Sequence, residues 1–260
     1  MQNPSNLPYI LEGGLGDFLQ FLPFVLGFPQ NRYFLLCHFK GAKELCKHLK
    51  IKMEQIEYYS SEAEKPAAIQ RLKQKGLPCP RIRYFDSNPF GSAKPLFKGD
   101  RPVVGIHLHA SKIAQYWLKE HGHQPKNLPL QLVDDLSKDY DLILFGLPED
   151  LTATKIKQTD RIKFVCFLDI VKSFSYISQC AALIGSDSAF KTLSSMNKIP
   201  TFVWIGDHED IFRDKFFVEP YVQDGNMGEY RFHVLADEYE QGLAATKEYL
   251  SKHIKQSPAF

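Results

Sequence analysis

The segment of residues 181–206 constrains the fold of this chain more than any other part of the sequence. It opens with an apolar run at residues 181–184 that does not alternate in polarity, which is typical of a parallel strand buried on both faces. A short polar stretch follows, then apolar residues at helical spacing, then a second apolar run at residues 201–205. The order of strand, polar turn, helix and strand predicts part of an α/β fold with a parallel sheet.

The polar turn of this segment consists of Ser186, Asp187 and Ser188. A helix that starts at the carboxyl end of a parallel strand presents N–H groups without intrahelical partners, together with the positive end of the helix dipole, and this suits a phosphate or another anion. Lys191 follows one turn into the helix, where its ammonium group could reach the same anion. The alternative is that Ser186 and Asp187 only cap the helix, and this stretch alone supports both interpretations equally.

Strands and helices alternate along the rest of the chain. In the first half the sequence predicts strands at residues 9–11, 33–37, 55–59 and 81–85, and helices at residues 17–26, 42–49 and 63–75. In the second half it predicts strands at residues 103–108, 142–145, 162–166, 181–184, 201–205 and 230–235, and helices at residues 129–137, 149–157, 170–179, 190–196 and 238–254. Residues 210–227 are aromatic-rich, and there we expect irregular structure.

The two halves are separated by a change in composition. Residues 88–102 hold three prolines and two glycines with little periodicity, as expected for a linker. We therefore expect an α/β protein of two Rossmann-like, doubly wound domains that face a cleft, with a first domain at residues 1–95 and a second at residues 96–260. The last predicted helix is long enough to pack back on the first domain.

Composition and charge exclude several classes of partner. The 260 residues are 44% hydrophobic and 24% charged, as in ordinary soluble globular proteins. The net charge of +2 and the absence of a basic run argue against a nucleic-acid partner. Five cysteines without CxxC spacing indicate reduced thiols in a cytoplasmic protein. The apolar stretch at residues 18–28 is too short to span a bilayer, which leaves peripheral contact with the inner face of a membrane open.

A glycine-rich turn follows the first predicted strand and contains Gly13, Gly14, Gly16 and Asp17. Its spacing differs from the dinucleotide-binding fingerprint, and no acidic residue ends the second strand, so no NAD-type cofactor is predicted. The glycines would let a ligand approach the backbone closely, with the carboxylate of Asp17 held at the helix start. The structural alternative is that Asp17 only stabilises the helix dipole, by about 0.3 to 1 kcal/mol.

Two histidines and a lysine mark the end of the first predicted strand of the second half. Alternation puts His107 and His109 on the same side of this strand, while Ser111 and Lys112 follow in the loop, where an ammonium group suits a phosphate. The histidine pair offers too few ligands for zinc, so no metal site is predicted. Histidines that are satisfied inside the sheet are an equally good explanation of the pair.

A third turn of this kind follows the next predicted strand. Gly146 ends that strand, and Glu149 lies at the start of the next helix, where it either caps the helix or accepts hydrogen bonds from a ribose. The turns at Ser111, Gly146 and Ser186 all fall at the carboxyl ends of strands of one predicted sheet. Because ligands of such sheets bind at that edge, the coincidence favours a shared ligand site.

These motifs together resemble a known family. Residues 16–23 are similar to the G-D-x-x-x-x-L-P opening of the ADP-heptose transferases of lipopolysaccharide core synthesis, glycosyltransferase family 9. Residues 107–117 resemble the H-P-G-A-S segment of that family, residues 144–149 its glycine turn with a nearby glutamate, and residues 185–194 its D-S-G-x-x-H-L-A nucleotide-sugar loop. The chain resembles a short and divergent member.

The resemblance implies a GT-B fold, in which the second domain binds a nucleotide-diphosphate sugar and the first binds a glycan or lipid-linked acceptor. It also implies an inverting transfer of a hexose or heptose, without a bound metal or other cofactor, with Asp17 as the general base. The residues implied to bind the nucleotide sugar are Gly14, Gly16, His109, Ser111, Lys112, Gly146, Glu149, Ser186, Asp187, Ser188 and Lys191.

Two other functions stay open at this point. A GT-B-fold epimerase or hydrolase of nucleotide sugars would need additional acid and base groups, for which His107 and His109 are the candidates. A catalytically silent nucleotide-sugar-binding module would keep the turns of the second half and make Asp17 dispensable.

Overall fold

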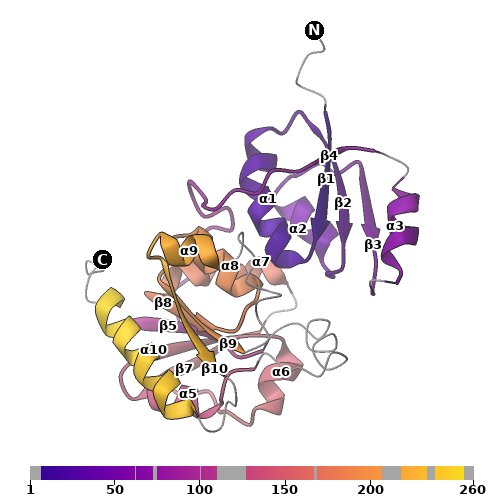
Figure 1. Ribbon diagram of the computed structural model, residues 1–260. Helices are drawn as coiled ribbons and strands as arrows, with labels where there is room; N and C mark the ends of the chain where they lie inside the picture. The colour runs from indigo at the N-terminus through magenta and orange to yellow at the C-terminus, as the bar shows by residue number, and fades with distance from the viewer. Residues whose placement is uncertain are drawn as a thin grey trace. The chain divides into compact units, whose positions relative to one another are not determined.

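The computed structural model describes residues 7–61, 63–72, 75–99, 101–109, 127–166, 169–206, 218–232 and 238–254. These residues form two parallel β-sheets with helices packed on them, as an α/β fold requires (Figure 1). The chain divides into two compact units, Met1–Phe90 and Gly91–Phe260, and each unit contains one of the sheets.

The first unit has a four-stranded sheet in the order β3-β2-β1-β4. Its strands are β1 (Pro8–Gly13), β2 (Arg32–Cys37), β3 (Gln55–Tyr58) and β4 (Leu77–Pro78), and its helices are α1 (Leu15–Gly27), α2 (Ala42–His48) and α3 (Lys65–Arg71). Strand β2 is apolar and buried from Tyr33 to Cys37, because it lies between β1 and β3 and both of its faces are covered.

The strand predicted at residues 81–85 is wrong. Strand β4 is only two residues long and precedes that segment, since Pro78 and Pro80 lack the N–H donors of a continuing ladder. The segment is instead tied to helix α1, because the N–H of Ile82 donates to the carbonyl of Gln20 at 2.8 Å. This path brings Arg81 next to the start of α1, a proximity that the local sequence pattern does not predict.

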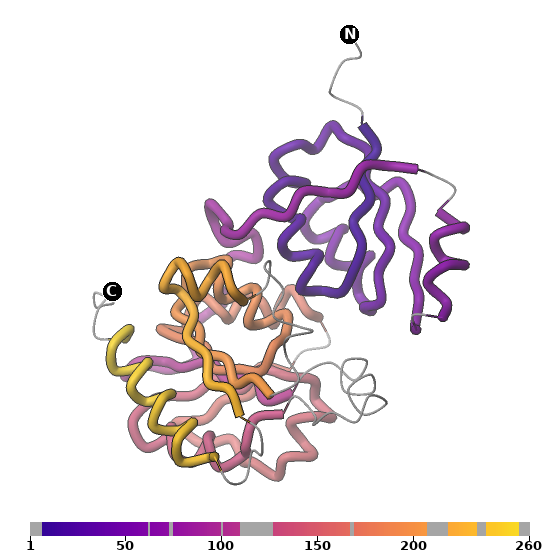
Figure 2. The backbone as a smooth tube through the Cα atoms, in the orientation of Figure 1, coloured from indigo at the N-terminus to yellow at the C-terminus, as the bar shows by residue number. Residues whose placement is uncertain are grey.

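The second unit has a six-stranded sheet in the order β10-β9-β8-β5-β6-β7, and all of its pairings are parallel. Its strands are β5 (Val103–His107), β6 (Asp141–Phe145), β7 (Ile162–Val165), β8 (Ala182–Gly185), β9 (Thr201–Gly206) and β10 (Met227–Phe232). Its helices are α5 (Gln131–Ser137), α6 (Pro148–Ala153), α7 (Ile170–Phe174), α8 (Ala189–Met196), α9 (Glu219–Gln223) and α10 (Tyr239–Ile254), with a short 3-10 helix at Ile177–Gln179. Figure 2 shows the course of this backbone.

The terminal helix α10 packs on the sheet of its own unit, against β8, β9 and β10. Gly242 makes this close approach possible, because a side chain there would collide with the ring of Trp204. The Trp204 indole N–H donates to the hydroxyl of Thr246 at 3.0 Å inside the same contact. Gly242 and Thr246 therefore lie on the buried face of α10, together with Tyr239 and Leu250.

The region predicted to be irregular, residues 210–227, contains a helix where the structure describes it. Helix α9 has Pro220 in its first turn, where the missing N–H costs nothing, and Tyr221 is fully buried. Within the described residues, no helix is long and apolar enough to cross a membrane.

Candidate functional site

The strand order of the second unit creates a topological switch point between β5 and β8. From β5 the chain builds the sheet outward through β6 and β7, and it then returns to add β8 on the other side of β5. Ligands of open α/β sheets bind beyond the carboxyl ends of the strands at such a point. His107 ends β5, and its register partners are Gly185 on β8 and Phe145 on β6.

The structure therefore brings two of the three predicted turns to one edge of the sheet. Gly146 follows β6 and Ser186 follows β8, on either side of β5. Glu149 lies in the first turn of α6, where its carboxylate is favourably placed for the helix dipole. Ser111 and Lys112, which the sequence assigns to the third turn, lie outside the described residues.

Helix α8 begins directly beyond the switch point. Its N-cap is Ser188, whose hydroxyl accepts from the N–H of Lys191 at 3.5 Å. Ser186 is therefore left without the capping role that one interpretation gave it. Its side chain is 1% exposed, and its hydroxyl has no hydrogen-bond partner among the described residues. A buried hydroxyl in this state costs free energy, so it suits a site that receives a ligand or a water molecule.

Asp187, just before the N-cap of α8, forms an ion pair with Lys191 in the first turn of that helix, with 2.8 Å between the Lys191 Nζ and an Asp187 carboxylate oxygen. The Lys191 side chain is 0% exposed, whereas that of Asp187 is 20% exposed. A fully buried lysine is rare and requires a paired partner. The accessible member of the pair is thus the carboxylate, and the ammonium group lies behind it.

His107 contributes a neutral imidazole to the same edge. Burial lowers its pKa to about 3, and the charge of His109 adds to this effect. Its ring lies 4.8 Å from that of Phe190, and its Nδ1 is buried without a partner among the described residues. His109 lies beyond the end of β5, with its Nδ1 3.1 Å from the side-chain oxygen of Asn127. The two histidines therefore have different surroundings.

The first unit has its own switch point, between β1 and β4, because β4 pairs with the opposite side of β1 from β2. Asp17 lies there in the first turn of α1, and its two carboxylate oxygens have different partners. One accepts from the N–H of Gly14 at 2.8 Å, and the other is 2.7 Å from a guanidinium nitrogen of Arg81. Both side chains of this ion pair are partly exposed, Asp17 by 20% and Arg81 by 24%.

The glycines beside Asp17 accommodate the protein's own side chains. Gly13 has a φ of 138°, and a side chain there would collide with the Asp17 carboxyl group. A Cβ at Gly14 would lie 2.9 Å from the Nε2 of His38. Neighbouring side chains of the protein thus explain the glycines at positions 13 and 14, while Gly16 lies in the first turn of α1. The close approach of a ligand to this backbone stays a prediction.

The sequence patterns do not single out two residues at this edge of the first sheet, Arg81 and His38. Arg81 reaches Asp17 from the segment after β4, and His38 follows the end of β2. Arg81 also lies over the ring of Phe21, at 5.5 Å from its centroid. In the sequence they are marked only by their place shortly after a strand. Many residues of any α/β chain share that place, so it does not identify a site.

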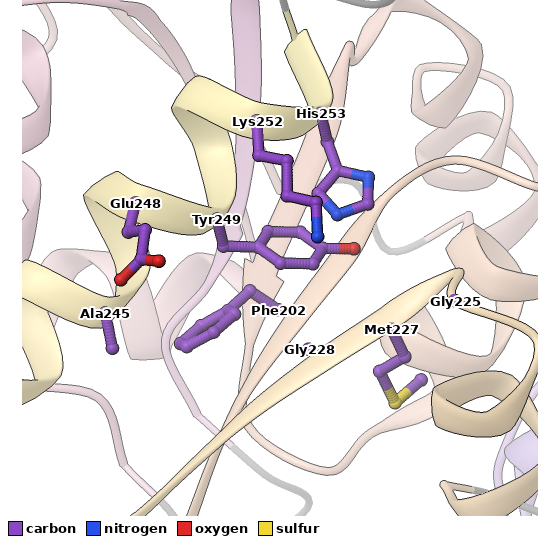
Figure 3. A pocket seen from close by; sticks show the side chains of 9 residues that line it. All are labelled: Phe202, Gly225, Met227, Gly228, Ala245, Glu248, Tyr249, Lys252 and His253. Carbon is purple, nitrogen blue, oxygen red and sulfur yellow. The ribbon is translucent and has the colours of Figure 1, made fainter.

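A pocket of about 390 Å³ lies at the opposite end of the second sheet. It is lined by Phe202, Gly225, Met227, Gly228, Ala245, Glu248, Tyr249, Lys252 and His253, which come from β9, β10, the turn before β10 and α10 (Figure 3). Phe202, Met227 and Gly228 belong to the amino ends of their strands. We assign the candidate site to the carboxyl edge, because the switch point, the start of α8 and the unpartnered polar atoms of His107 and Ser186 occur there.

Residue types that bind metals are scattered over the described part of the chain. No group of three or more His, Cys, Asp or Glu side chains there could hold a metal ion. All five cysteines are free, and burial raises the pKa of the Cys37 thiol to about 11 and those of Cys46 and Cys79 to about 12. These three thiols are therefore protonated at neutral pH.

Comparisons with known proteins identify the fold. No protein-family model matches the sequence, and no curated protein is significantly similar to it. The structure is similar to E. coli heptosyltransferase WaaC with ADP-2-deoxy-2-fluoro heptose, with a TM-score of 0.55 and 11% identity over 95% of this chain and 99% of that one. A family 9 glycosyltransferase from Veillonella parvula gives a TM-score of 0.54 and 11% identity over 98% of both chains.

A third similar structure has a different activity in its name. It is a putative UDP-N-acetylglucosamine 2-epimerase from Listeria monocytogenes, with a TM-score of 0.59 and 11% identity over 100% of this chain and 93% of that one. At such identities the similarity establishes the fold. The chain consists of Rossmann-like α/β domains of the GT-B class, the architecture that these nucleotide-sugar enzymes share.

Proposed function

We propose that this protein is a metal-independent, inverting glycosyltransferase that moves a sugar from a nucleotide-diphosphate donor to a hydroxyl group of a glycan or lipid-linked acceptor. The observation that carries this proposal is the position of two of the predicted polar turns, after β6 and β8, at the carboxyl edge of the second sheet beside its switch point, in a chain with the GT-B fold. In this role the protein works in the cytoplasm, and a lipid-linked acceptor would bring it to the inner face of a membrane.

In this proposal the second unit binds the donor. The start of α8 directs its N–H groups and dipole toward the diphosphate, which replaces the cation that other transferases use. The buried hydroxyl of Ser186 and the neutral ring of His107 provide hydrogen-bonding groups without a net charge. The proposed donor site is completed by Gly146 and Glu149. It also includes Ser111 and Lys112, which lie outside the described residues.

The first unit binds the acceptor, with Asp17 as the general base. The acceptor oxygen attacks the anomeric carbon of the donor, the bond to the diphosphate breaks, and Asp17 takes the hydroxyl proton, so a single displacement inverts the anomeric configuration. The contacts from Gly14 and Arg81 hold the carboxylate in one orientation.

The proposal is tested by the melting temperature of the protein with a panel of nucleotide sugars, in buffer with EDTA. A ligand present at 100 times its dissociation constant stabilises by about 2.7 kcal/mol, and each kcal/mol shifts the melting temperature by about 2 to 4 °C for a chain of this size. We expect at least one nucleotide sugar to raise it without a divalent metal. Stabilisation that appears only after magnesium or manganese is added would refute the metal-independent donor site.

Nucleotide-sugar epimerisation is the second candidate, favoured by the structural similarity to the Listeria protein. The two activities differ in whether they need an acceptor. An epimerase or hydrolase converts the nucleotide sugar in the absence of an acceptor, and proton NMR of the sugar incubated with the protein alone detects this directly. A silent binding module would bind the sugar and convert nothing, with or without acceptor.

A further inference from the structure

Lys191 occupies a position where its charge has no packing explanation. It lies in α8 between Phe190 and Leu193, in a helix whose residues from Phe190 to Met196 are all buried. An apolar side chain of similar length would fill this place without the desolvation cost of an ammonium group, which amounts to several kcal/mol for a buried ion. The charge must therefore be explained by its partner.

Asp187, the residue just before the N-cap of the same helix, provides a carboxylate partner for Lys191. The sequence suggests that Lys191 reaches outward to a phosphate. The structure gives the opposite arrangement, since none of the lysine side chain is exposed while one fifth of the aspartate is. A ligand beyond β8 would meet the carboxylate first.

We infer that Lys191 is a positioning residue, whose buried ammonium group fixes the Asp187 carboxylate so that Asp187 accepts hydrogen bonds from hydroxyl groups of the donor sugar. This role rests on the proposed function. A carboxylate repels a diphosphate but suits sugar hydroxyls, which are donors. The buried, unpartnered hydroxyl of the neighbouring Ser186 independently indicates that this turn is completed by a ligand.

The experiment is a double-mutant cycle of Lys191→Met and Asp187→Asn, with calorimetric affinities for the nucleotide sugar identified by the melting-temperature panel and for its nucleoside diphosphate. We expect Lys191→Met to weaken binding of the nucleotide sugar about 10- to 100-fold, the effect of losing a charge-assisted hydrogen bond, and to change diphosphate binding less than about 2-fold. In the Asp187→Asn background, Lys191→Met should have no further effect.

The stability of the same proteins separates positioning from a purely structural role. Lys191→Met alone removes one partner of a buried pair, whereas the double variant leaves no buried charge and should recover stability. A positioning role predicts that the double variant is stable but still binds the sugar weakly, and Lys191→Arg, which keeps the charge, should restore part of the affinity. A stable double variant with unaltered sugar affinity would overturn the inference.

Lys138→Met is the matched control, since Lys138 pairs with Asp135 at 2.6 Å at the carboxyl end of α5 but is 68% exposed. It should leave both affinities unchanged.

Equal losses of sugar and diphosphate affinity on Lys191→Met would show direct phosphate contact and overturn the inference alone. An unaltered protein that binds no nucleotide sugar would instead refute the proposed function, and the inference with it. If Lys191→Met does not fold, the double variant carries the test.

Discussion

The two units of this protein each place an aspartate paired with a basic side chain at the switch point of a parallel sheet, but they build the pair differently. In the first unit Asp17 is held by Arg81, from a segment distant in sequence, and both side chains are partly exposed. In the second unit Asp187 is held by Lys191, four residues later in the first turn of α8, and the cation is fully buried.

The difference matters because burial changes what an ion pair does. A partly exposed pair contributes little to stability, since water solvates either member when the other is lost. A buried pair contributes little net stability when intact, but removing one member leaves an uncompensated charge. We therefore expect substitutions in the Asp17–Arg81 pair to lower mainly the activity. Substitutions in the Asp187–Lys191 pair should lower both the stability and the affinity for the ligand.

The largest expected effect is that of Asp17→Asn on turnover. Asparagine keeps the oxygen that accepts from Gly14 but cannot take a proton, so turnover should fall by about 10² to 10⁴ while donor affinity stays nearly the same. Steady-state transfer assays and donor calorimetry measure the two quantities. Glu12→Gln is the control, because Glu12 is another paired carboxylate at the end of β1 and is not part of the proposed site. Full transfer activity in Asp17→Asn would remove this residue from the mechanism.

The next effect is that of Asp187→Asn on stability. The change leaves the buried Lys191 ammonium without its carboxylate, so the free energy of unfolding should fall by about 3 to 5 kcal/mol, as measured in urea. Asp139→Asn is the control, because Asp139 is 57% exposed and pairs with Lys247 at 3.7 Å. It should cost less than about 0.5 kcal/mol. Similar losses for both variants would contradict the contrast between buried and exposed pairs.

The pH dependence of stability sharpens the contrast further. Burial lowers the pKa of His107 to about 3, so the folded state keeps it neutral while the unfolded chain binds a proton below about pH 6.5. The unfolded state thus binds more protons, and stability falls as the pH falls from about 6.5 toward 3, by at most about 1.4 kcal/mol per pH unit for this group. His107→Gln should flatten this slope in urea unfolding between pH 6.5 and 4.

The control for the pH dependence of the unfolding free energy is His48→Gln, which changes an exposed residue of α2. It should reproduce the slope of the unaltered protein. If His107→Gln left the slope as steep as before, the edge of the second sheet would be more hydrated than the structure indicates.

The smallest expected effect is that of Arg81→Met on stability. Because Arg81 and Asp17 are both partly exposed, the loss should be no more than about 1 kcal/mol in urea unfolding. The turnover of the transfer reaction should fall by a larger factor than a free-energy change of that size would give, because the carboxylate of Asp17 loses its orientation. Lys94→Met, which changes an exposed lysine of the second unit, is the control for both measurements. A loss of stability as large as that of Asp187→Asn would mean that the two pairs are energetically alike.

Much of this architecture is visible in the sequence because it depends on local periodicity. Apolar runs without alternation predict the buried strands β5, β6, β8 and β9, and the turn from Ser186 to Ser188 predicts the start of α8. No strand forms at residues 81–85, because the chain pairs with β1 earlier, at Leu77–Pro78, and Ile82 then bonds to helix α1, which no local pattern encodes.

The sequence by itself determined the order of strands and helices and the polar residue types at the strand ends, because these follow from patterns within a few residues. Tertiary structure alone decided which of these residues meet. Arg81 reaches Asp17 because β4 pairs beside β1, and Lys191 is buried because the whole of α8 is enclosed. A lysine one turn into a helix is normally exposed, so its burial depends on neighbours that no local pattern encodes.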